Sequence, residues 1–232
     1  MHDAPWGVIF DVDGTMVDNH AYHERAWITW GERNGYPIDH TYYREHIHSR
    51  SNEVITKELL NDAWRPEAAA AIEHEKERIY RELYRPVVTP LPGLIELVHA
   101  LSEAGVPMAA ASNAPKPNAD MVLEELGMDA VFVAVYTPEQ GIAGKPAPDL
   151  LWKAAEAMWV PVSRCLVFED SVSGFKAAEA AGAPFVAITQ GVNPGCLDHA
   201  EGAVARHADF TGLTVEKLAG YVNTGGTAPP AG

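Results

Sequence analysis

The sequence predicts an α/β fold: a doubly wound parallel sheet with an all-helical segment inserted after its first strand. Three observations lead to this prediction. Short, continuously apolar runs such as residues 8–10 and 165–168 recur along the chain, and such runs are typical of strands buried on both faces. Helix-patterned segments separate the later runs, an order that produces parallel strands joined by crossover helices. Residues 18–85 show helical patterning without a strand candidate. Together these features indicate a Rossmann-like core.

The first strand runs into two acids, Asp11 and Asp13, after which Gly14 lets the backbone turn away. A helix follows, with Asn19 as its expected N-cap and apolar residues at helical spacing. The His-rich residues 40–52 are expected to form a polar loop. Further helices are predicted over residues 52–60 and 66–84.

From residue 90 onward the chain alternates between helix and strand patterns. Helices are predicted over 94–104, 117–126, 147–158 and 172–181, and strands over 106–111, 130–136, 165–168 and 184–189. The expected organisation is a Rossmann-like core of residues 1–17 and 86–222, a helical domain of residues 18–85, and a flexible tail of residues 223–232. The tail consists mainly of Gly, Thr, Pro and Ala, which offer little to pack.

The charge balance argues against two classes of partner. Lys and Arg total 17 against 32 Asp and Glu, a net charge of −15. Such a protein repels the phosphate backbone of nucleic acids and anionic membrane surfaces. An anionic small substrate would need a local cation in order to bind. We therefore expect neither nucleic acid nor a membrane as a partner.

Cysteine content and the N-terminal sequence bear on location. Cys165 and Cys196 are too few for a disulfide scaffold, which favours a reducing compartment. Residues 1–6 lack the basic stretch and apolar core of a signal peptide, and no segment reaches the roughly 18 apolar residues of a membrane span. We expect a cytoplasmic protein, with a monomer as the favoured oligomeric state.

Polar residues after the predicted strands are the candidate functional residues, because ligands bind beyond the carboxyl ends of parallel strands. Asp11 and Asp13 are two residues apart, which suits a nucleophile with a nearby proton donor, although an acidic pair before glycine is also a common strand-ending turn. Ser112 and Asn113 end another strand. A hydroxyl and backbone amides there can hold phosphoryl oxygens, or they can form a turn or a helix cap.

Two further strand ends carry charged residues. Lys145, in a loop-to-helix junction flanked by Gly and Pro, is the candidate to neutralise charge, although exposed turn lysines are common. Glu169 and Asp170 can cap the following helix, but as adjacent acids they are also candidate metal ligands, and all-oxygen ligands favour Mg²⁺ over Zn²⁺. If these acids converge with Asp11 and Asp13, their repulsion is of order several kcal/mol. A divalent cation together with Lys145 would offset it.

Four ordered segments resemble the motifs of the haloacid dehalogenase superfamily. They are Asp-Val-Asp-Gly-Thr at residues 11–15, Ser112-Asn113, Lys145 within Gly-Lys-Pro-Ala-Pro-Asp, and Phe-Glu-Asp-Ser at residues 168–171. The early helical insert resembles the small helical cap of one subgroup, and residues 22–27 resemble the cap-entry helix of its β-phosphoglucomutase-like branch. The resemblance implies a cap that closes to exclude water and to select the substrate.

The resemblance also implies a role for each candidate residue. Asp11 would attack phosphorus and form an aspartyl-phosphate, and Asp13 would act as general acid and base. Mg²⁺ would bind the Asp11 carboxylate, the Asp13 carbonyl and Asp170, with Glu169 as a ligand or an outer neighbour. The implied catalytic set is Asp11, Asp13, Ser112 and Lys145, of which the last two hold the phosphoryl group. The implied substrate-binding set is Thr15, His23, Trp27, Arg50, Ser112, Asn113, Lys116 and Lys145.

The resemblance favours a Mg²⁺-dependent phosphatase of a small phosphorylated metabolite such as a sugar phosphate. Thr15 matches the common form of the first motif in phosphatases. The cap-entry helix favours a β-phosphoglucomutase instead, although that branch often departs from threonine at the position of Thr15. Dehalogenation is disfavoured, because that reaction needs neither Asp13 nor a metal. A non-catalytic phosphometabolite-binding module would be expected to lack one of the four motifs, and all four are present. For His23 and Arg50, ordinary packing or solvated roles are the alternatives.

Overall fold

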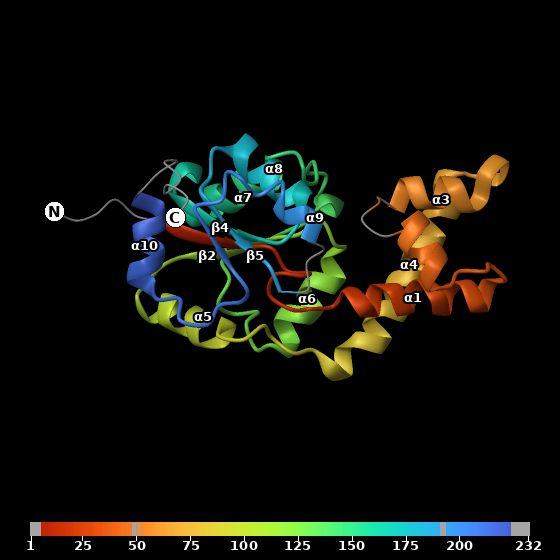
Figure 1. Cartoon of the computed structure of the whole chain (residues 1–232), viewed down its shortest axis with the longest axis horizontal. Coiled ribbons are helices and arrows are strands. Elements are labelled where there is room, and N and C mark those ends of the chain that lie inside the picture. The colour runs from red at the N-terminus through yellow and green to blue at the C-terminus, as the bar shows by residue number, and fades with distance from the viewer. Residues whose placement is uncertain (1–5, 48–49, 51, 191–193, 224–232) are drawn as a thin grey trace. The chain divides into compact units, whose positions relative to one another are not determined.

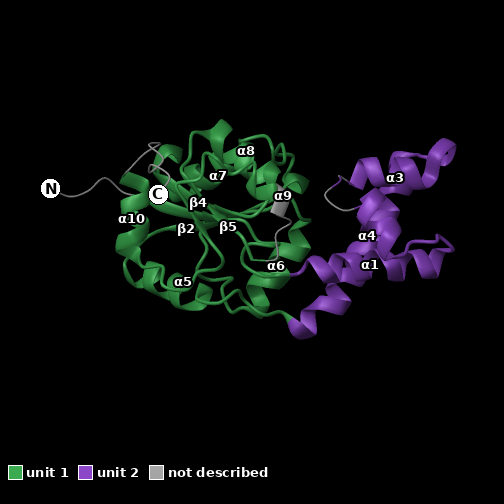
Figure 2. Ribbon diagram, in the orientation of Figure 1, with its two compact units in different colours: residues 1–18, 88–232 green, residues 19–87 purple. Residues whose placement is uncertain are grey.

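The computed structural model describes residues 6–47, 50, 52–190 and 194–223. Two units divide the chain: one comprises Met1–Asp18 and Val88–Gly232, the other Asn19–Val87 (Figure 2). The second unit begins and ends close to the bounds predicted for the helical domain, residues 18–85. Of the predicted tail, only Asn223 is described, and it is the last residue of a helix. The remaining residues of that tail lie outside the described part of the chain.

A parallel sheet of six strands lies at the centre of the first unit, in the order β3-β2-β1-β4-β5-β6. From β1 the sheet extends through β2 and β3 on one side and through β4, β5 and β6 on the other, which is the doubly wound arrangement. The predicted fold class is confirmed. The strands are β1 (Gly7–Phe10), β2 (Met108–Ala111), β3 (Val135–Tyr136), β4 (Cys165–Glu169), β5 (Phe185–Ile188) and β6 (Ala205–His207).

Helices cover both faces of this sheet, which is why its central strands are continuously apolar (Figure 1). The helices of this unit are α5 (Leu94–Glu103), α6 (Lys116–Glu125), α7 (Asp149–Met158), α8 (Val172–Ala181), α9 (Pro194–Leu197) and α10 (Val215–Asn223). Short 3₁₀ turns are η4 (Pro138–Gln140) and η5 (Val162–Arg164). Helices α7 and α8 pack together on one face, and α10 lies beside α5 on the other.

Alternate side chains of the central strands enter different parts of the core, because a strand has a side-chain period of two. Ile9 and Val167 belong to the core cluster that includes residues of α7 and α8. The next residues along each strand, Phe10 and Phe168, stack on one another with 5.2 Å between ring centroids, and Phe210 contacts both rings. All five side chains are buried. The two strands that end in the candidate acids are therefore anchored from both faces.

Two predicted strand features differ from the structure. The strand predicted over residues 130–136 is reduced to Val135–Tyr136. Before it, the chain is held in a turn by the Val131 N–H bond to Met128, and Phe132 turns inward to pack edge-on against Phe10. The apolar pattern thus reflects core filling rather than strand pairing. The edge strand β6 was not predicted, because none of its three residues is fully buried, Arg206 is exposed, and two of the three are polar.

The described residues of the second unit form helices and the turns that connect them, with no strand, as predicted. Its helices are α1 (His20–Asn34), α2 (His40–Tyr42), α3 (Asn52–Leu60) and α4 (Pro66–Tyr84), with a π-helical turn η1 (Tyr43–Ile47) and 3₁₀ turns η2 (Asn61–Ala63) and η3 (Arg85–Val87). Helices α1 and α4 pack against one another. In neither unit does a described helix combine the length and the apolar character needed to cross a membrane.

Two local predictions for this unit were wrong. Asn19 occupies the N-cap position of α1, but its side chain makes no capping bond. Its Nδ2 instead donates to the Tyr80 hydroxyl of α4 at 2.6 Å, because tertiary packing offers a buried partner. The stretch predicted as a polar loop, residues 40–52, is helical as far as Ile47. Asp39 caps this segment by accepting from the Tyr42 N–H at 2.8 Å, a signal that the sequence carries and that the prediction overlooked.

Candidate active site

The candidate site lies where β1 and β4 end side by side. These strands pair in register, with Phe10 opposite Phe168, and the Asp11 N–H donates to the Phe168 carbonyl at 3.0 Å. The residues that follow, Asp11 on one strand and Glu169 and Asp170 on the other, therefore emerge at the same edge of the sheet. This edge is the topological switch point, where doubly wound sheets bind their ligands.

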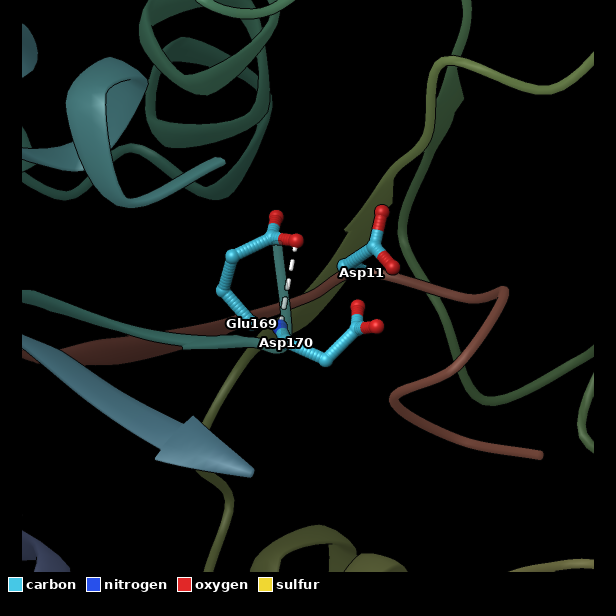
Figure 3. A group of neighbouring side chains, drawn as sticks. All are labelled: Asp11, Glu169 and Asp170. Carbon is cyan, nitrogen blue, oxygen red and sulfur yellow. Dashed lines mark hydrogen bonds between the residues drawn. The ribbon is translucent and has the colours of Figure 1, made fainter. Parts of the chain in front are cut away.

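Three carboxyl groups gather at this edge (Figure 3). Asp11, Glu169 and Asp170 are all buried, and each offers an oxygen within 4.8 Å of the others. The carboxylate of Asp13 is not part of this group. Buried carboxylates at such distances repel one another strongly unless a cation lies among them. The group is therefore compatible with a bound metal ion.

Lys145 supplies one positive charge to the group. Its buried Nζ lies 2.7 Å from Asp11 Oδ1 and 2.6 Å from Glu169 Oε2. Burial by itself disfavours the charged ammonium, but the two carboxylates outweigh that effect and raise the pKa of Lys145 above its usual range. The lysine is thus a permanent cation that links the ends of β1 and β4 to the loop before α7.

One lysine does not balance three carboxylates. Burial, together with the charge of Glu169, raises the pKa of Asp11 well above its ordinary value, although Lys145 opposes this effect. Burial also raises the pKa of Glu169. In the absence of a further cation, the ionised cluster carries excess negative charge. Its all-oxygen donors fit a hard divalent cation, which would restore the balance.

Glu169 is held by protein donors at both of its oxygens. Oε2 accepts from Lys145, while Oε1 accepts from the Ser171 hydroxyl at 2.8 Å and from the N–H groups of Asp170 and Ser171 at 3.2 Å. The carboxyl group also fills the space beside Gly174 in the first turn of α8, where an added Cβ would lie 1.8 Å from Glu169 Cδ. A glycine at residue 174 is therefore required by the position of this carboxylate.

The loop after β1 connects Asp11 to the rest of the cluster. Gly14 has φ +80°, a conformation that favours glycine, and its N–H donates to the Val17 carbonyl at 2.8 Å. The turn predicted at Gly14 is thus present. It places the fully buried Thr15 so that its hydroxyl donates to Asp170 Oδ1 at 3.0 Å. A substrate contact for Thr15 stays a prediction, and the contact that the structure shows is to a candidate metal ligand. Asp13, which lies between Asp11 and Thr15 in the sequence, is half-buried.

Ser112 and Asn113 follow β2, the other neighbour of β1. Ser112 is buried; its N–H continues the ladder to the Tyr136 carbonyl at 3.0 Å, and its Oγ accepts from the Ala114 N–H at 3.1 Å. The Asn113 side chain pairs with the backbone of Lys145, with Nδ2 donating to the carbonyl at 2.9 Å and Oδ1 accepting from the N–H at 2.8 Å. Sequence reasoning missed this pairing, because nothing local links residues 32 positions apart.

Lys116 begins α6 and does not join the acidic cluster in this structure. Its ammonium lies 2.6 and 2.7 Å from the two carboxylate oxygens of Asp120, one helical turn along, and about two fifths of its side chain is exposed. Its N–H donates to Glu139 at 2.6 Å. The substrate contact predicted for Lys116 would require this ion pair to open.

The remaining predicted residues belong to the second unit. His23 stacks on Tyr80 with 4.0 Å between ring centroids, and its Nδ1 lies 3.0 Å from Lys76 Nζ. The Lys76 ammonium lies over the Trp27 ring at 5.6 Å and pairs with the buried Glu77 at 2.8 Å. This buried pair was not predicted, although the apolar stripe of α4 passes through residue 76 and could have drawn attention to it.

Arg50, also in the second unit, is held by neighbouring residues. Its Nη1 donates to the Glu58 carboxylate at 2.6 Å and to the His46 carbonyl at 2.7 Å. The other Glu58 oxygen lies 2.6 Å from His46 Nδ1. About a third of the Arg50 side chain is exposed, so the guanidinium keeps donors that can reach solvent or a ligand.

The fold and the site together define an α/β protein with an acidic, lysine-containing centre at the switch point of a parallel sheet. The chain belongs to the haloacid dehalogenase-like hydrolase family, whose model matches residues 7–182. The predicted family is thereby confirmed, and the chain is an enzyme of this hydrolase family. The matched range includes the candidate residues of both units and the ends of β1, β2 and β4.

Known proteins of this family include close relatives of the chain. Hexitol phosphatase A of Escherichia coli (strain K12) is 32% identical over 182 residues, which is 78% of this chain and 82% of that protein. Beta-phosphoglucomutase of Bacillus subtilis (strain 168) is 30% identical over 192 residues, which is 79% of this chain and 83% of that protein. The solved structure of a HAD hydrolase, family IA, variant 3, from Entamoeba histolytica HM-1:IMSS has a TM-score of 0.85 at 26% identity, covering 94% of this chain and 99% of that one.

Proposed function

We propose that this protein is a Mg²⁺-dependent phosphatase that hydrolyses a small phosphorylated metabolite, of which a sugar phosphate is the favoured type. The observation that carries the proposal is the buried contact of Lys145 with Asp11 and Glu169, beside Asp170, at the carboxyl ends of β1 and β4. A carboxylate nucleophile, a fixed cation and an acidic cluster suited to a metal ion are the parts that phosphoryl transfer requires.

Asp11 is the proposed nucleophile. One of its carboxylate oxygens forms a bond to phosphorus, and the bond between phosphorus and the ester oxygen of the substrate breaks. Asp13 gives its proton to the departing oxygen, so that the alcohol leaves neutral. In the second half-reaction Asp13 takes a proton from water as the water oxygen bonds to phosphorus, and the Asp11–phosphorus bond breaks. Inorganic phosphate is released, and both acids return to their starting states.

Lys145 and Ser112 stabilise the phosphoryl group in this proposal. The ammonium of Lys145 already contacts Asp11, so it lies beside any group that is transferred to that carboxylate. The Ser112 hydroxyl and the backbone amides that follow it supply donors at the end of β2, the strand next to β1. A buried, pre-positioned cation is worth more here than in water, because the site excludes solvent.

The proposed Mg²⁺ ligands are the carboxylates of Asp11 and Asp170 and the backbone carbonyl of Asp13. When bound, the ion would neutralise charge on the phosphoryl oxygens and on the cluster itself. Thr15 supports this assignment, because its hydroxyl orients Asp170. For Glu169 the structure favours the role of an outer neighbour, since both of its oxygens are already held by protein donors.

The second unit is the proposed cap that selects the substrate. His23, Trp27 and Arg50 are its candidate binding residues. Lys76 contacts the first two, and Glu58 separately holds Arg50. The relatives named Hexitol phosphatase A and Beta-phosphoglucomutase support a phosphorylated sugar as the substrate class. We further propose a monomer acting in the cytoplasm, in keeping with two free thiols at Cys165 and Cys196.

A second candidate is a β-phosphoglucomutase-type enzyme, which would return the phosphoryl group to another hydroxyl of the same sugar. The relative from Bacillus subtilis, at 30% identity, supports this alternative. A non-catalytic binding module is disfavoured, because the acids, the lysine and the serine are all present and Lys145 directly contacts Asp11.

The deciding experiment measures phosphate release with Mg²⁺ across a panel of sugar and small-acid phosphates. A coupled assay for glucose 6-phosphate formed from β-glucose 1-phosphate runs in parallel. Release without isomerisation establishes the phosphatase, and isomerisation with little free phosphate establishes the mutase. The Asp11→Asn variant is the control for contaminating phosphatases. Neither product from any substrate, with Asp11→Asn indistinguishable from wild type, would overturn the proposal.

A further inference from the structure

Asn113 has contacts that its predicted role in substrate binding does not explain. Its side-chain amide forms two hydrogen bonds with the backbone of Lys145, one to the N–H and one to the carbonyl. An amide that pairs with both groups of one residue resembles the pairing between neighbouring strands, and it fixes both the position and the direction of that residue. Asn113 directly follows Ser112 at the end of β2, so it ties the lysine to the sheet.

Within the described part of the chain, the loop of residues 141–148 around Lys145 has few backbone hydrogen bonds of its own. It carries prolines at residues 146 and 148, which have no N–H to donate. One backbone hydrogen bond between described residues begins and ends within this loop, from the Ala147 N–H to the Gly144 carbonyl at 3.0 Å. The backbone groups of Lys145 itself are satisfied by Asn113. The Asn113 side chain thus satisfies the backbone polar groups of Lys145, as neighbouring strands satisfy one another in a sheet.

Gly144 provides the space that this pairing needs. A Cβ added at Gly144 would lie 2.8 Å from Asn113 Oδ1 and 2.9 Å from Pro138 Cγ, closer than carbon atoms approach such neighbours. The φ angle of Gly144 is not positive, so the glycine is required by space and not by backbone conformation. The absence of a side chain at residue 144 therefore leaves room for the Asn113 amide to reach the Lys145 backbone.

We infer that Asn113 is a positioning residue that sets the Lys145 ammonium against Asp11 and Glu169. The inference rests on the proposed function for its catalytic consequence. Lysine is a long and flexible side chain, and its Nζ meets two carboxylates at 2.6 and 2.7 Å only if its backbone is held in place. Catalytic groups need placement to within about 0.5 Å, and a misplacement of about 1 Å can cost on the order of 100-fold in rate.

The test is a double-mutant cycle on kcat/KM with Asn113→Ala, Lys145→Ala and the combination. Asn113→Ala should lower kcat/KM by about 10- to 100-fold, with the loss in kcat rather than in KM. In the Lys145→Ala background it should cause no further loss, because the residue that it positions is gone. Losses that multiply, a loss confined to KM, or no loss in the wild-type background would overturn the inference.

Two more variants test the positioning role of Asn113. Gly144→Ala should lower kcat in the same way, because the new Cβ displaces the amide. Asn113→Asp keeps an acceptor for the Lys145 N–H but places an oxygen against its carbonyl, so it should restore little activity. The matched control is Gln140→Ala, since Gln140 is an exposed amide that holds another loop of the same unit through Thr137 and Val135. Its kcat/KM should stay within about twofold of wild type.

A second measurement separates this inference from the proposed function. Acetylation of Lys145 by acetic anhydride, followed by mass spectrometry, reports on how firmly the ammonium is held, with or without turnover. The reaction should be slow in wild type and Gln140→Ala and faster in Asn113→Ala. If no phosphoester is hydrolysed by the wild type, the proposed function fails and the labelling alone decides the inference. Equal labelling of Lys145 in Asn113→Ala and wild type would overturn it.

Discussion

The Glu169 carboxyl group lies in the place where a side chain at residue 174 would be. An alanine Cβ at Gly174 would be 1.8 Å from Glu169 Cδ, and the same carboxyl group accepts from Lys145 at 2.6 Å. The carboxyl group of Glu169, the last residue of β4, therefore contacts both helix α8 and Lys145. A change at a glycine that contacts no ligand is expected to disturb the whole site.

Gly174→Ala is expected to lower kcat by at least about 10-fold and to cost about 1–3 kcal/mol of unfolding free energy, because the Cβ forces Glu169 away from Lys145 and Ser171. Turnover assays and denaturant unfolding check both effects. The matched control is Gly220→Ala in α10, where an added Cβ has no neighbour within 4 Å. It should stabilise the protein by up to about 1 kcal/mol. Equal behaviour of the two variants would contradict the role given to Gly174.

Thr15→Val removes the hydroxyl that donates to Asp170 and keeps the shape of the side chain. The expected result is a roughly 10-fold rise in the Mg²⁺ concentration needed for half-maximal activity, because an outer partner of a metal ligand has been lost. Magnesium titrations of initial rates measure it. Thr56→Val serves as control, since Thr56 is another buried threonine, with its hydroxyl bonded to the Asn52 carbonyl. An unchanged Mg²⁺ requirement in Thr15→Val would argue that Asp170 needs no orientation.

Asp11→Asn is expected to abolish turnover and yet stabilise the metal-free protein at neutral pH. Burial and the charge of Glu169 raise the pKa of Asp11 above its ordinary value of 3.8. The free energy of unfolding that the protonated Asp11 side chain contributes is therefore fully present at low pH. It is lost as the pH rises through the raised pKa of Asp11. Each tenfold difference in the proton affinity of this carboxyl group between the folded and unfolded states changes the free energy of unfolding by about 1.4 kcal/mol. Because Asn resembles the protonated acid, the stability gap between variant and wild type should shrink as the pH falls.

Denaturant unfolding in the presence of a chelator, between about pH 5 and pH 8, tests this sign. Added Mg²⁺ should reverse the order, because the ion stabilises the ionised wild type by about 2.7 kcal/mol at 100 times its dissociation constant. A wild type that is the more stable protein at every pH without metal would show that Lys145 alone balances the cluster.

Lys76→Met is expected to destabilise the protein by about 3 kcal/mol, because it removes the buried ammonium that lies 2.8 Å from Glu77. Thermal and denaturant unfolding measure the loss. Arg78→Met on the same helix is the control: Arg78 pairs with Glu82 in an exposed ion pair, so its removal should cost no more than about 0.5 kcal/mol. Similar losses for the two variants would mean that the Lys76–Glu77 pair contributes no more than a surface pair.

The sequence by itself determined the parts of the molecule that repeat locally. Apolar runs of strand length and helices between them predicted the parallel sheet, and the absence of strand patterns over residues 18–85 predicted the helical unit. The acids at the ends of β1 and β4 were visible because a buried apolar run that stops at an acid is a local pattern. The edge strand β6 was missed, since a half-exposed strand of three residues has no such pattern.

Only the tertiary structure decided which of these residues meet. Lys145 and Asp11 are 134 positions apart, Thr15 and Asp170 are 155 apart, and Asn113 reaches the Lys145 backbone across 32 positions. Hydrogen bonds and ion pairs of this kind depend on strand order and on loop paths, which periodicity does not encode. The physical reason is that a local pattern reports which face of an element is apolar, whereas the partner of a polar side chain is set by packing between elements.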